Sequence, residues 1–334
     1  MAIQQGNYGR LLEPGLRKIF METYQEKPEQ FSQVFNVTTS DKAIETDFRM
    51  GGFGLFDTKE SLGAVKYQDP TTTKALQYVH QEFASGFTVE RKLIDDEQYN
   101  TINKMSSALA RAARATVETQ AATVLNTGIQ GGSGVNAPVN GFDGLPLIAY
   151  NHVRLDGGLM SNRLGYKTDG TAGTTGTPVY GGVADGALSD RNLKAALIQA
   201  HAQVDDRGIL IQCKPTVLVV PPALEYTART LVGGQNLSVL GTGVLSGGSS
   251  DATTAKNTLP AFKIVVMDYL TSSTNWFIFD PTLIQLNFFW RKKLEFKNME
   301  DFDTMQAKYR AYMRFSAGYS DYRGIVGSLG TGAA

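Results

Sequence analysis

The side chains of this chain that could bind a transition metal or act as a nucleophile belong to three histidines and one cysteine. They are His80, His152, His201 and Cys213, and they are scattered along the sequence. A zinc site or a catalytic thiol needs several such groups at defined spacing, and neither HExxH nor GxSxG is present. We therefore expect no metal site. We expect Cys213 to be a small apolar side chain, with a reactive thiol as the alternative.

Two acidic clusters offer oxygen atoms that could bind a cation. Asp95, Asp96 and Glu97 stand at the start of a predicted helix, and residues 300–303 hold three more carboxylates between two predicted strands. Neighbouring helical side chains point apart, so the first cluster is better explained by the helix dipole, which favours negative charge at an N-terminus. The second cluster is predicted to be a solvated turn.

Phosphate binding has little support in the sequence. No GxxxxGK[ST] loop occurs, and GTGVLSGG at 241–248 lacks the GxGxxG spacing. Arg291, Lys292 and Lys293 could touch a phosphate, but in a strand of a neutral protein they are predicted to form a solvated face. We expect no cofactor and no catalytic residue, which disfavours an enzyme.

The composition limits the class of protein further. The 334 residues include 32 basic and 32 acidic side chains, so the formal net charge is zero, and 42% are hydrophobic. Dedicated nucleic-acid binders carry a basic excess, so contact with nucleic acid is expected to be weak and general. The single cysteine excludes an intrachain disulfide, and no secretory signal or membrane-spanning run is recognised. We expect a soluble protein made in the cytoplasm.

One long helix is predicted over residues 96–128, because this segment lacks proline and has no glycine before Gly128. At ~1.5 Å per residue it would be a rod of roughly 45–50 Å. Its apolar stripe is narrow, with Ala and Thr in the middle, so a flat partner surface is expected along one side. The stripe consists of Ile102, Met105, Leu109, Ala112, Ala113, Thr116, Val124 and Leu125.

Strand-like segments flank this helix. Residues 47–94 hold two such stretches around a polar middle, and neither face is cleanly apolar, so an outside partner is needed to hold them. Residues 305–315 alternate apolar and polar side chains, after the strand-like 286–296 and the acidic turn KNMEDFD. A long antiparallel ribbon is predicted, with the helix stripe on its apolar face.

A helix, a buried strand and a second helix follow one another at 190–232. The first helix has Ser189 as its N-cap and Gly208 as its stop, PTVLVV is apolar on both faces, and PPALEYTARTLV restarts a helix. Next, AFKIVVMDYLTSSTNWFIFD is predicted to be two strands joined by the turn TSST. These segments indicate an α/β layer.

This order of elements resembles the HK97-fold major capsid proteins of tailed bacteriophages. LSDRNLKAALIQAHAQVDDRG and KPTVLVVPPALEYTARTLV are similar to the family's axial-domain helix, turn, strand and following helix. WFIFD and FKNMEDFDTMQAKYRAYMRFSAGYSDYRGIVG resemble its C-terminal run. The likeness covers nearly the whole chain and implies an α+β fold of the HK97 type.

The resemblance divides the chain into six segments. They are an N-arm at 1–48, an extended loop (a β-hairpin) at 49–92, the spine helix of the peripheral domain at 93–127, an axial α/β domain at 128–275, peripheral-domain strands at 276–315, and a return strand to the axial domain with the C-terminal tail at 316–334. The spine helix is expected to lie with the peripheral β-ribbon.

The function implied by the resemblance is that of a structural capsid protein. Copies would form pentamers and hexamers of an icosahedral shell around packaged double-stranded DNA, in a virion assembled in the cytoplasm of a host bacterium. The partners implied are further copies, a portal, a separate scaffolding protein and in some cases a decoration protein, with weak contact to DNA and none to a membrane. A separate scaffold, or none, is expected because the loop begins near residue 49, which leaves no room for a fused scaffolding segment.

Six residues are expected at subunit interfaces, and two other classes of protein stay open. The interface residues are Tyr78, Phe83, Phe87, Arg91, Arg111 and Arg114. The first alternative is an encapsulin, a bacterial compartment of the same fold that encloses an enzyme. The second is an α/β enzyme with a site on the layer at 190–232.

Overall fold

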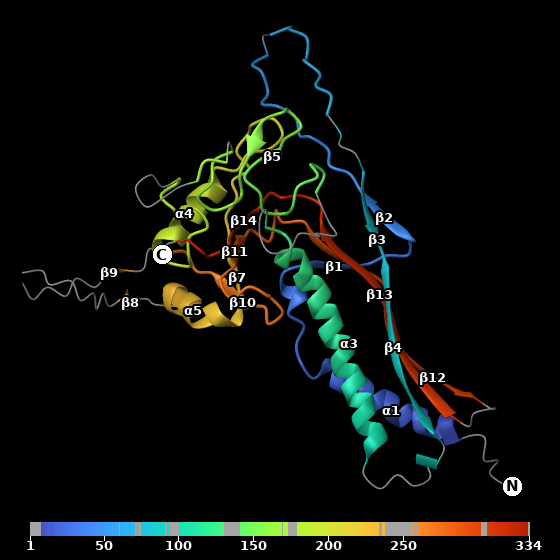
Figure 1. The fold of residues 1–334 in the computed structure, drawn as a ribbon. Coiled ribbons are helices and arrows are strands. Elements are labelled where there is room, and N and C mark those ends of the chain that lie inside the picture. The colour runs from blue at the N-terminus through green and yellow to red at the C-terminus, as the bar shows by residue number, and fades with distance from the viewer. Residues whose placement is uncertain are drawn as a thin grey trace, which may run out of the picture. The chain divides into compact units, whose positions relative to one another are not determined.

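The computed structural model describes residues 8–59, 61–70, 72, 75–90, 92–93, 100–129, 141–168, 170–172, 179–233, 236–237, 255–256, 259–301 and 306–332. The chain forms two compact units, each built from pieces that are far apart in the sequence (Figure 1). Unit 1 comprises Met1–Asp47, Ala75–Val124 and Leu286–Ser320. Unit 2 comprises Phe48–Lys74, Leu125–Gln285 and Asp321–Ala334.

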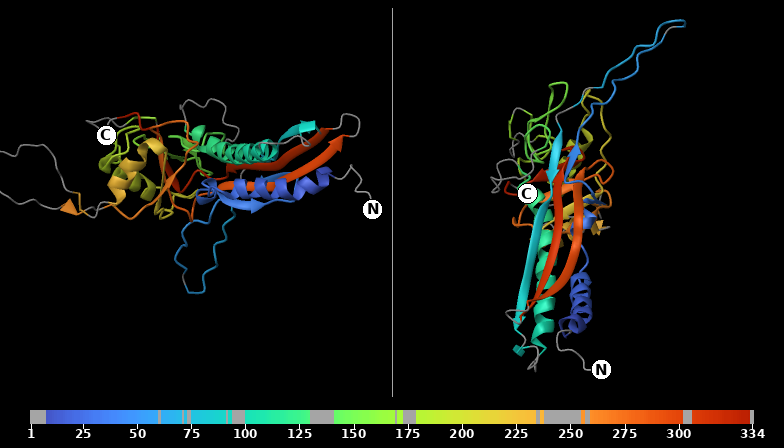
Figure 2. Two further views of the ribbon diagram at one scale, coloured as in Figure 1. Left: turned by 90° about the horizontal axis from the view of Figure 1, so that it is seen from below. Right: turned by 90° about the vertical axis from the view of Figure 1, so that its right-hand side faces the viewer.

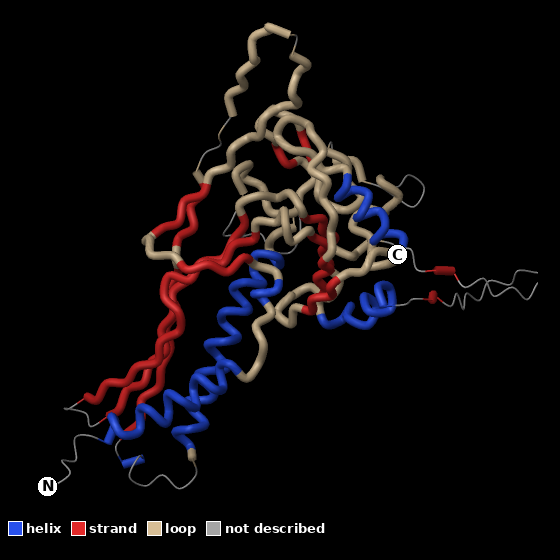
Figure 3. Tube along the Cα trace, turned by 180° about the vertical axis from the view of Figure 1, so that it is seen from behind, coloured by secondary structure: helices blue, strands red, loops and turns tan. Residues whose placement is uncertain are grey.

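Unit 1 is built on a four-stranded sheet of order β1-β12-β13-β4. Its strands are β1 (Asn36–Thr39), β12 (Leu286–Asp301), β13 (Gln306–Tyr319) and β4 (Gln81–Glu90). The pair of β1 with β12 is parallel, whereas β13 is antiparallel to both of its neighbours. The three long strands run side by side in Figure 3. The predicted alternation of β13 is confirmed, because its apolar side chains are buried and its charged ones lie outside.

Two helices, α1 (Tyr8–Gln25) and α3 (Thr101–Asn126), accompany these strands (Figure 2). Phe20 of α1 is fully buried and stacks on Phe296 of β12, with the ring centroids 4.7 Å apart. The Ser106 hydroxyl of α3 donates a hydrogen bond to the carbonyl of Leu16, so the two helices also contact each other. One apolar cluster joins them to the sheet. It contains Leu16, Phe20, Val89, Ile102, Ala110, Ala113, Phe296, Ala307, Tyr309 and Ala311.

Helix α3 is the predicted rod, and its small side chains explain how it packs. Its 26 residues span about 39 Å at 1.5 Å per residue. Ala110, Ala121 and Ala122 have no exposed surface, so α3 is closely packed at these positions. The segment 94–99, where we expected the first turn, lies outside the described residues. No described helix combines the length and the apolar character needed to cross a bilayer.

The pairing predicted for residues 49–92 is wrong. Strand β4 pairs with β13 from Gln81 opposite Phe315 to Glu90 opposite Gln306, and β3 (Leu76–Val79) pairs with β2 (Ile44–Asp47). The outside partner that this segment needs is therefore a later strand of the same chain. Strand β12 also continues to Asp301, through residues that we predicted to be a turn.

Unit 2 is built on a second four-stranded sheet, of order β10-β7-β11-β14. Its strands are β10 (Lys263–Val266), β7 (Val217–Val220), β11 (Trp276–Phe279) and β14 (Ile325–Ser328). Helix α4 (Asp190–His201) contacts β14 at one edge, and α5 (Glu225–Gly233) contacts β7 and β10 at the other. The buried strand predicted at PTVLVV is confirmed as β7, in which all four side chains are buried.

Two details of this sheet differ from the prediction. Strands β10 and β11 do not pair with each other, because β7 lies between them, parallel to β10 and antiparallel to β11. Strand β11 therefore belongs to this sheet and not to the peripheral strands predicted at 276–315. The N-cap at Ser189 is confirmed, since its side chain accepts a hydrogen bond from the Asn192 N–H. However, α4 ends at His201, well before Gly208.

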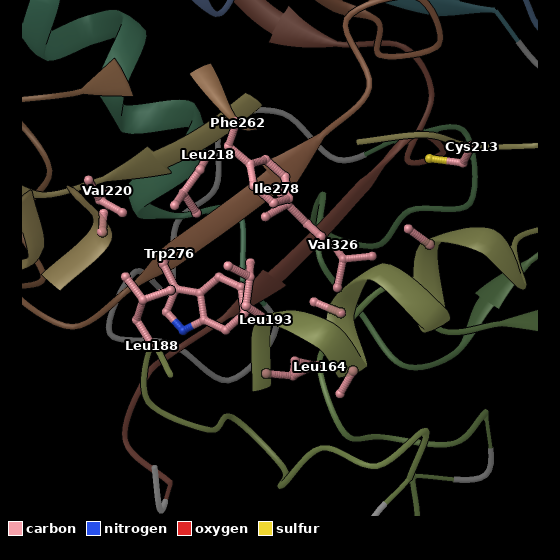
Figure 4. Close-up of a cluster of buried hydrophobic side chains, with 14 residues drawn as sticks. Leu164, Leu188, Leu193, Cys213, Leu218, Val220, Phe262, Trp276, Ile278 and Val326 are labelled. Atoms are coloured by element: carbon pink, nitrogen blue, oxygen red, sulfur yellow. The ribbon is translucent and has the colours of Figure 1, made fainter. Parts of the chain in front are cut away.

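The core of unit 2 lies between this sheet and its helices (Figure 4). Trp276 is fully buried among Leu188, Leu193 and Ile278, and its indole N–H donates to the carbonyl of Gly186 at 3.0 Å. The buried polar group of the tryptophan is thus satisfied. The shorter elements of the chain are η2 (Phe31–Gln33), β5 (His152–Val153), β6 (Leu159–Met160), η3 (Pro222–Leu224), β8 (Asn236–Leu237) and β9 (Ala255–Lys256).

Candidate assembly surface

Residues 48–74, here called the extended loop, carry many large apolar side chains that are exposed to solvent. Phe56 is 94% exposed and Tyr67 is 90% exposed. Its described residues form no helix or strand apart from a bridge between Met50 and Thr72, and Figure 3 draws them as loop. The exposed apolar set is Phe48, Met50, Phe53, Leu55, Phe56, Leu62, Val65 and Tyr67. An exposed apolar set of this size marks an interaction surface.

The base of the extended loop is tied into unit 2 by a buried cluster of charges. Arg49 is 8% exposed, and its Nε donates to Oδ2 of Asp206 at 3.0 Å while Nη2 donates to Oδ1. Arg323 donates to the same carboxylate at 2.7 Å, and Asp321 lies 3.6 Å from the Arg49 guanidinium. The ring of Tyr322 lies beneath both guanidinium groups, at 5.1 and 5.6 Å. We call these five residues the loop-base cluster.

The charges of the loop-base cluster balance, with two guanidinium groups facing two carboxylates. Burial alone would raise the pKa of Asp206, but the hydrogen bond and charge of Arg323 lower it, as do the Leu155 N–H and the charge of Arg49. The net pKa of this carboxyl is below its usual range, so Asp206 is held as an anion. Burial also raises the pKa of Tyr322, whose ring stays neutral.

A second set of contacts holds both arms of the extended loop near its base. Arg207 donates from Nε to the carbonyl of Gly52 at 3.3 Å and from Nη2 to the carbonyl of Asp69 at 3.0 Å. Further out, the Gly54 N–H donates to the side chain of Gln68 at 2.7 Å. Both arms of the extended loop are therefore bound to the turn that contains Arg207. The exposed apolar side chains of the loop lie on a segment whose base is held in place.

Three of the predicted interface residues are engaged inside unit 1. Tyr78 is 3% exposed, its hydroxyl lies 2.6 Å from the Ser320 hydroxyl, and burial raises its pKa to about 12. Phe83 stacks on Phe315 with centroids 4.7 Å apart, and Phe87 stacks on Tyr309 at 5.0 Å. We expected Phe83 and Phe87 on the loop, but both are strand residues whose neighbours belong to the same chain.

Arg114 is also used inside unit 1, where it fastens the N-terminal segment to α3. Its guanidinium lies 3.9 Å from the ring centroid of Tyr24, donates to the Tyr24 carbonyl and pairs with Glu29 at 2.9 Å. One turn further, the Glu118 carboxylate accepts hydrogen bonds from the N–H groups of Gln30 and Phe31. Of the remaining predicted residues, Arg111 is exposed on α3, and Arg91 lies outside the described residues.

The histidine and acidic side chains considered above as metal ligands do not form a cluster among the described residues. Among the described residues, no three His, Cys, Asp or Glu side chains are grouped to hold a metal ion. His152 is buried, stacks on Tyr322 at 3.8 Å and lies 2.6 Å from the Asp143 carboxylate. His80 is buried beside Ser316, and burial and the charge of Arg314 lower its pKa. The acidic residues 95–97 lie outside the described residues.

Cys213 is fully buried, and burial together with the charge of Asp280 raises its thiol pKa from 9.0 to about 12. A thiol with so high a pKa forms little of the reactive thiolate. We therefore expect the native protein to react with a disulfide reagent at neutral pH at least about 100-fold more slowly than the protein in denaturant. Stopped-flow mixing with the reagent, followed by absorbance, measures the reaction rates of the native and the denatured protein. Equal rates would show that Cys213 is accessible.

The basic run at 291–293 lies in β12 and is solvated, as predicted. Lys292 pairs with Glu295 at 2.8 Å, and Arg291 lies 3.9 Å from Asp41. On the next strand, Lys308 pairs with Asp301 at 2.8 Å. These partners neutralise much of the basic character of the sheet, so it is a poor match for a phosphate backbone.

Comparison with known proteins identifies relatives. The sequence matches the family model described as phage capsid protein over residues 73–328. No curated protein matches the sequence. Three similar solved structures are the capsid of a native GTA particle (TM-score 0.53, 14% identity, 89% of this chain and 88% of that chain), the capsid of an empty GTA particle (0.51, 14%, 92% and 95%) and a structure of Mycobacterium phage Adephagia (0.50, 13%, 90% and 90%). At these identities the likeness shows a shared fold.

Proposed function

Because this chain belongs to the phage capsid protein family, we propose that its copies join through the extended loop into the pentamers and hexamers of an icosahedral shell. The chain is a major capsid protein with an HK97-like α+β fold, a structural component of the virion and not an enzyme. It self-assembles into capsid oligomers. The family match does not favour the encapsulin alternative.

The observation that carries the proposal is the exposed apolar surface of the extended loop. Phe53, Leu55 and Phe56 are each more than half exposed in the single chain. Covering one such side chain fully contributes about 1.5–3 kcal/mol, which is modest for one contact. In a closed shell the same contact repeats at every subunit, and repetition turns modest affinities into a stable assembly.

In this proposal the two units lie at different places in the shell. Unit 2 holds the α/β layer and β14, and the proposal places it around the five- and six-fold axes as the axial domain. Unit 1 holds the rod α3 and the long strands, and the proposal places it at the periphery as a stiff rib. The expected segment boundaries change in this proposal: the extended loop is residues 48–74, residues 75–90 go with the peripheral strands, and β11 goes with the axial domain.

The remaining partners are part of the same proposal. Packaged double-stranded DNA would contact the shell weakly and without sequence preference, which the zero net charge supports. A portal and a separate scaffolding protein would act during assembly in the host cytoplasm, and a decoration protein could bind outside. Expressing the chain alone and then with a candidate scaffold would show whether assembly requires the second protein.

Replacing Phe53 and Phe56 together with serine should prevent shell formation and leave the subunit folded, because both side chains are exposed in the single chain. Negative-stain microscopy and sedimentation measure assembly, and circular dichroism measures folding. Lys66→Gln is the matched control, since it changes an exposed ion pair on the same loop. Shells of the double variant at the wild-type subunit concentration would contradict the proposal.

Phe83→Ser should instead destabilise unit 1, because Phe83 stacks on Phe315.

A further inference from the structure

His80 is the single residue between two strands that belong to different sheets of unit 1. Strand β3 ends at Val79 and pairs with β2, whereas β4 begins at Gln81 and pairs with β13. Strand β2 ends at Asp47, directly before the extended loop, and β3 begins shortly after the loop ends. The β2–β3 ribbon therefore leads into both arms of the extended loop, and it meets the four-stranded sheet at His80 (Figure 1).

Side chains at this junction hold the β2–β3 ribbon to the end of β13. The Tyr78 hydroxyl lies 2.6 Å from the Ser320 hydroxyl, and Nδ1 of His80 lies 3.0 Å from the Ser316 hydroxyl. His80 is only 4% exposed. The imidazole is thus part of the contact between the ribbon and the sheet, and a change in its charge acts where the two meet.

The surroundings of His80 favour the neutral ring. A neutral imidazole has one N–H, which Nδ1 can donate to the Ser316 hydroxyl, whereas a protonated imidazole has two N–H groups. Nε2 of His80 is buried, and no described residue is its hydrogen-bond partner. Protonation would therefore place an N–H and a positive charge in a buried position that offers no acceptor, which is unfavourable.

The charges that act on His80 come from three neighbouring strands. Arg314 of β13 and Arg291 of β12 are cations, and Glu45 of β2 is an anion. Nε of each arginine is buried and donates no hydrogen bond to a described residue. Burial is the largest influence on the ring. Together with the two guanidinium groups it outweighs Glu45, so the pKa of His80 is lower than its ordinary value of 6.5.

Each of these three charges also has a partner nearer the surface. The pairs are Arg314 with Glu82 at 3.6 Å, Arg291 with Asp41 at 3.9 Å and Glu45 with Lys42 at 3.2 Å. The outer member of each pair is exposed, and water screens exposed charges. The pairs therefore supply no buried anion that could stabilise a charged ring at His80.

We propose that His80 is an acid-sensitive hinge: protonation of its ring separates the β2–β3 ribbon from the end of β13 and frees the strands that lead into the extended loop. Opening gives the charged ring the water that the closed junction excludes. Because the folded pKa is below 6.5, the junction is fully stable above pH 6.5 and loses stability as the pH falls below it. The hinge lies within unit 1 and is independent of the proposed function, whereas any effect on shell assembly rests on that function.

Hydrogen exchange of residues 76–82 tests the hinge in the wild-type chain. After correction for intrinsic rates, protection at pH 5 should be about threefold to thirtyfold lower than at pH 7.5, because a histidine with an ordinary pKa of 6.5 contributes at most about thirtyfold at pH 5. The amides of α3 should keep their protection, which distinguishes opening of the hinge from unfolding of unit 1. Equal protection of residues 76–82 at the two pH values would overturn the inference.

Two variants assign the effect to the ring. His80→Asn keeps an amide near Ser316 and cannot be protonated, so its protection should be the same at both pH values. His201→Asn, at an exposed position in α4, is the matched control and should behave like the wild type. An acid loss in His80→Asn as large as that in the wild type would contradict the hinge. Circular dichroism shows whether each variant is folded.

Arg314→Gln provides a test that keeps the histidine. Removing one cation beside the ring should make the loss of protection at pH 5 smaller than in the wild type. Arg310→Gln, exposed on the same strand, should leave the loss unchanged, and equal losses in the two variants would mean that Arg314 does not act on His80. Microscopy of the same samples keeps the two proposals apart. A chain that shows the acid loss but forms no shells at either pH would reject the proposed function and support the hinge.

Discussion

Replacing Asp206 with alanine should lower the free energy of unfolding of unit 2 by about 3–5 kcal/mol. The carboxylate is 2% exposed and accepts hydrogen bonds from Arg49, Arg323 and the Leu155 N–H. Without it, two buried guanidinium groups lose their shared partner, and only Asp321 remains to balance them. The loss of one partner from a buried ion cluster costs more than the loss of a surface pair, because the remaining charges cannot be solvated.

Urea unfolding followed by the fluorescence of Trp276, which lies in the core of unit 2, measures this loss in a Trp290→Phe background, because Trp290 belongs to unit 1. Asp57→Ala is the matched control, because its salt bridge to Lys66 is exposed and should be worth at most about 1 kcal/mol. Protease cleavage within residues 48–70 should also become faster in Asp206→Ala, because Arg49 is released from the base of the loop. Equal stability of the two variants would show that the loop-base cluster adds nothing to the fold.

The contribution of Asp206 should depend on pH in one direction. Its pKa is lower in the folded chain than the ordinary value of 3.8, so folding favours the charged form. The stabilisation is therefore present above pH 3.8 and is lost as the pH falls through the lower folded pKa. The difference in unfolding free energy between the wild type and Asp206→Asn should stay constant between about pH 5 and pH 8 and shrink only in stronger acid.

Phe20→Ala should destabilise unit 1 by about 3–5 kcal/mol and release α1. The ring has no exposed surface, stacks on Phe296 and joins α1 to the cluster that contains Ile102 and Tyr309. The cavity would open between the helix and β12, where α1 has its closest sheet contacts.

Hydrogen exchange of residues 14–25 reports the release of α1 directly. Lys18→Ala on the same helix is the control, because Lys18 is exposed and forms only an i,i+4 pair with Glu22. The control should keep wild-type protection, whereas Phe20→Ala should exchange at rates near those of an unfolded peptide. Protected amides in both variants would mean that Arg114 and Glu118 alone hold the N-terminal segment.

The parts of the fold that follow from local pattern were predictable from the sequence. The period of two in β13 and the continuous apolar run of β7 each report burial of the segment that carries them. The stripe predicted on α3 is buried at Ile102, Ala113, Val124 and Leu125, whereas Ala112 is exposed. The partners of these segments were not predictable. Strand β7 separates β10 from β11, although β10 and β11 are neighbours in the sequence. Pairing depends on residues far apart in the chain, which no local window contains.

The same limit explains why Phe83 and Phe87 were expected on a loop and not in a strand. Phe83 and Phe87 lie in a segment with no clean apolar face, which suggested a partner in another subunit. The structure supplies that partner as Phe315 and Tyr309, from the far end of the chain. The exposed aromatics Phe53 and Phe56 were within the loop predicted at 49–92 but were not singled out, because their exposure depends on the absence of any strand around them.

The central place of β13 governs the order in which this chain can fold. Strand β13 lies between β12 and β4, so β4 has no partner in the sheet until residues 306–319 have been synthesised. During that interval the unpaired edge of β4, which carries Phe83 and Phe87, can pair with other nascent chains. Contacts of such large sequence separation also make folding slow. A host cell that produces many copies at once would have to shield this edge, so the yield of subunits should depend on chaperone capacity as much as on their final stability.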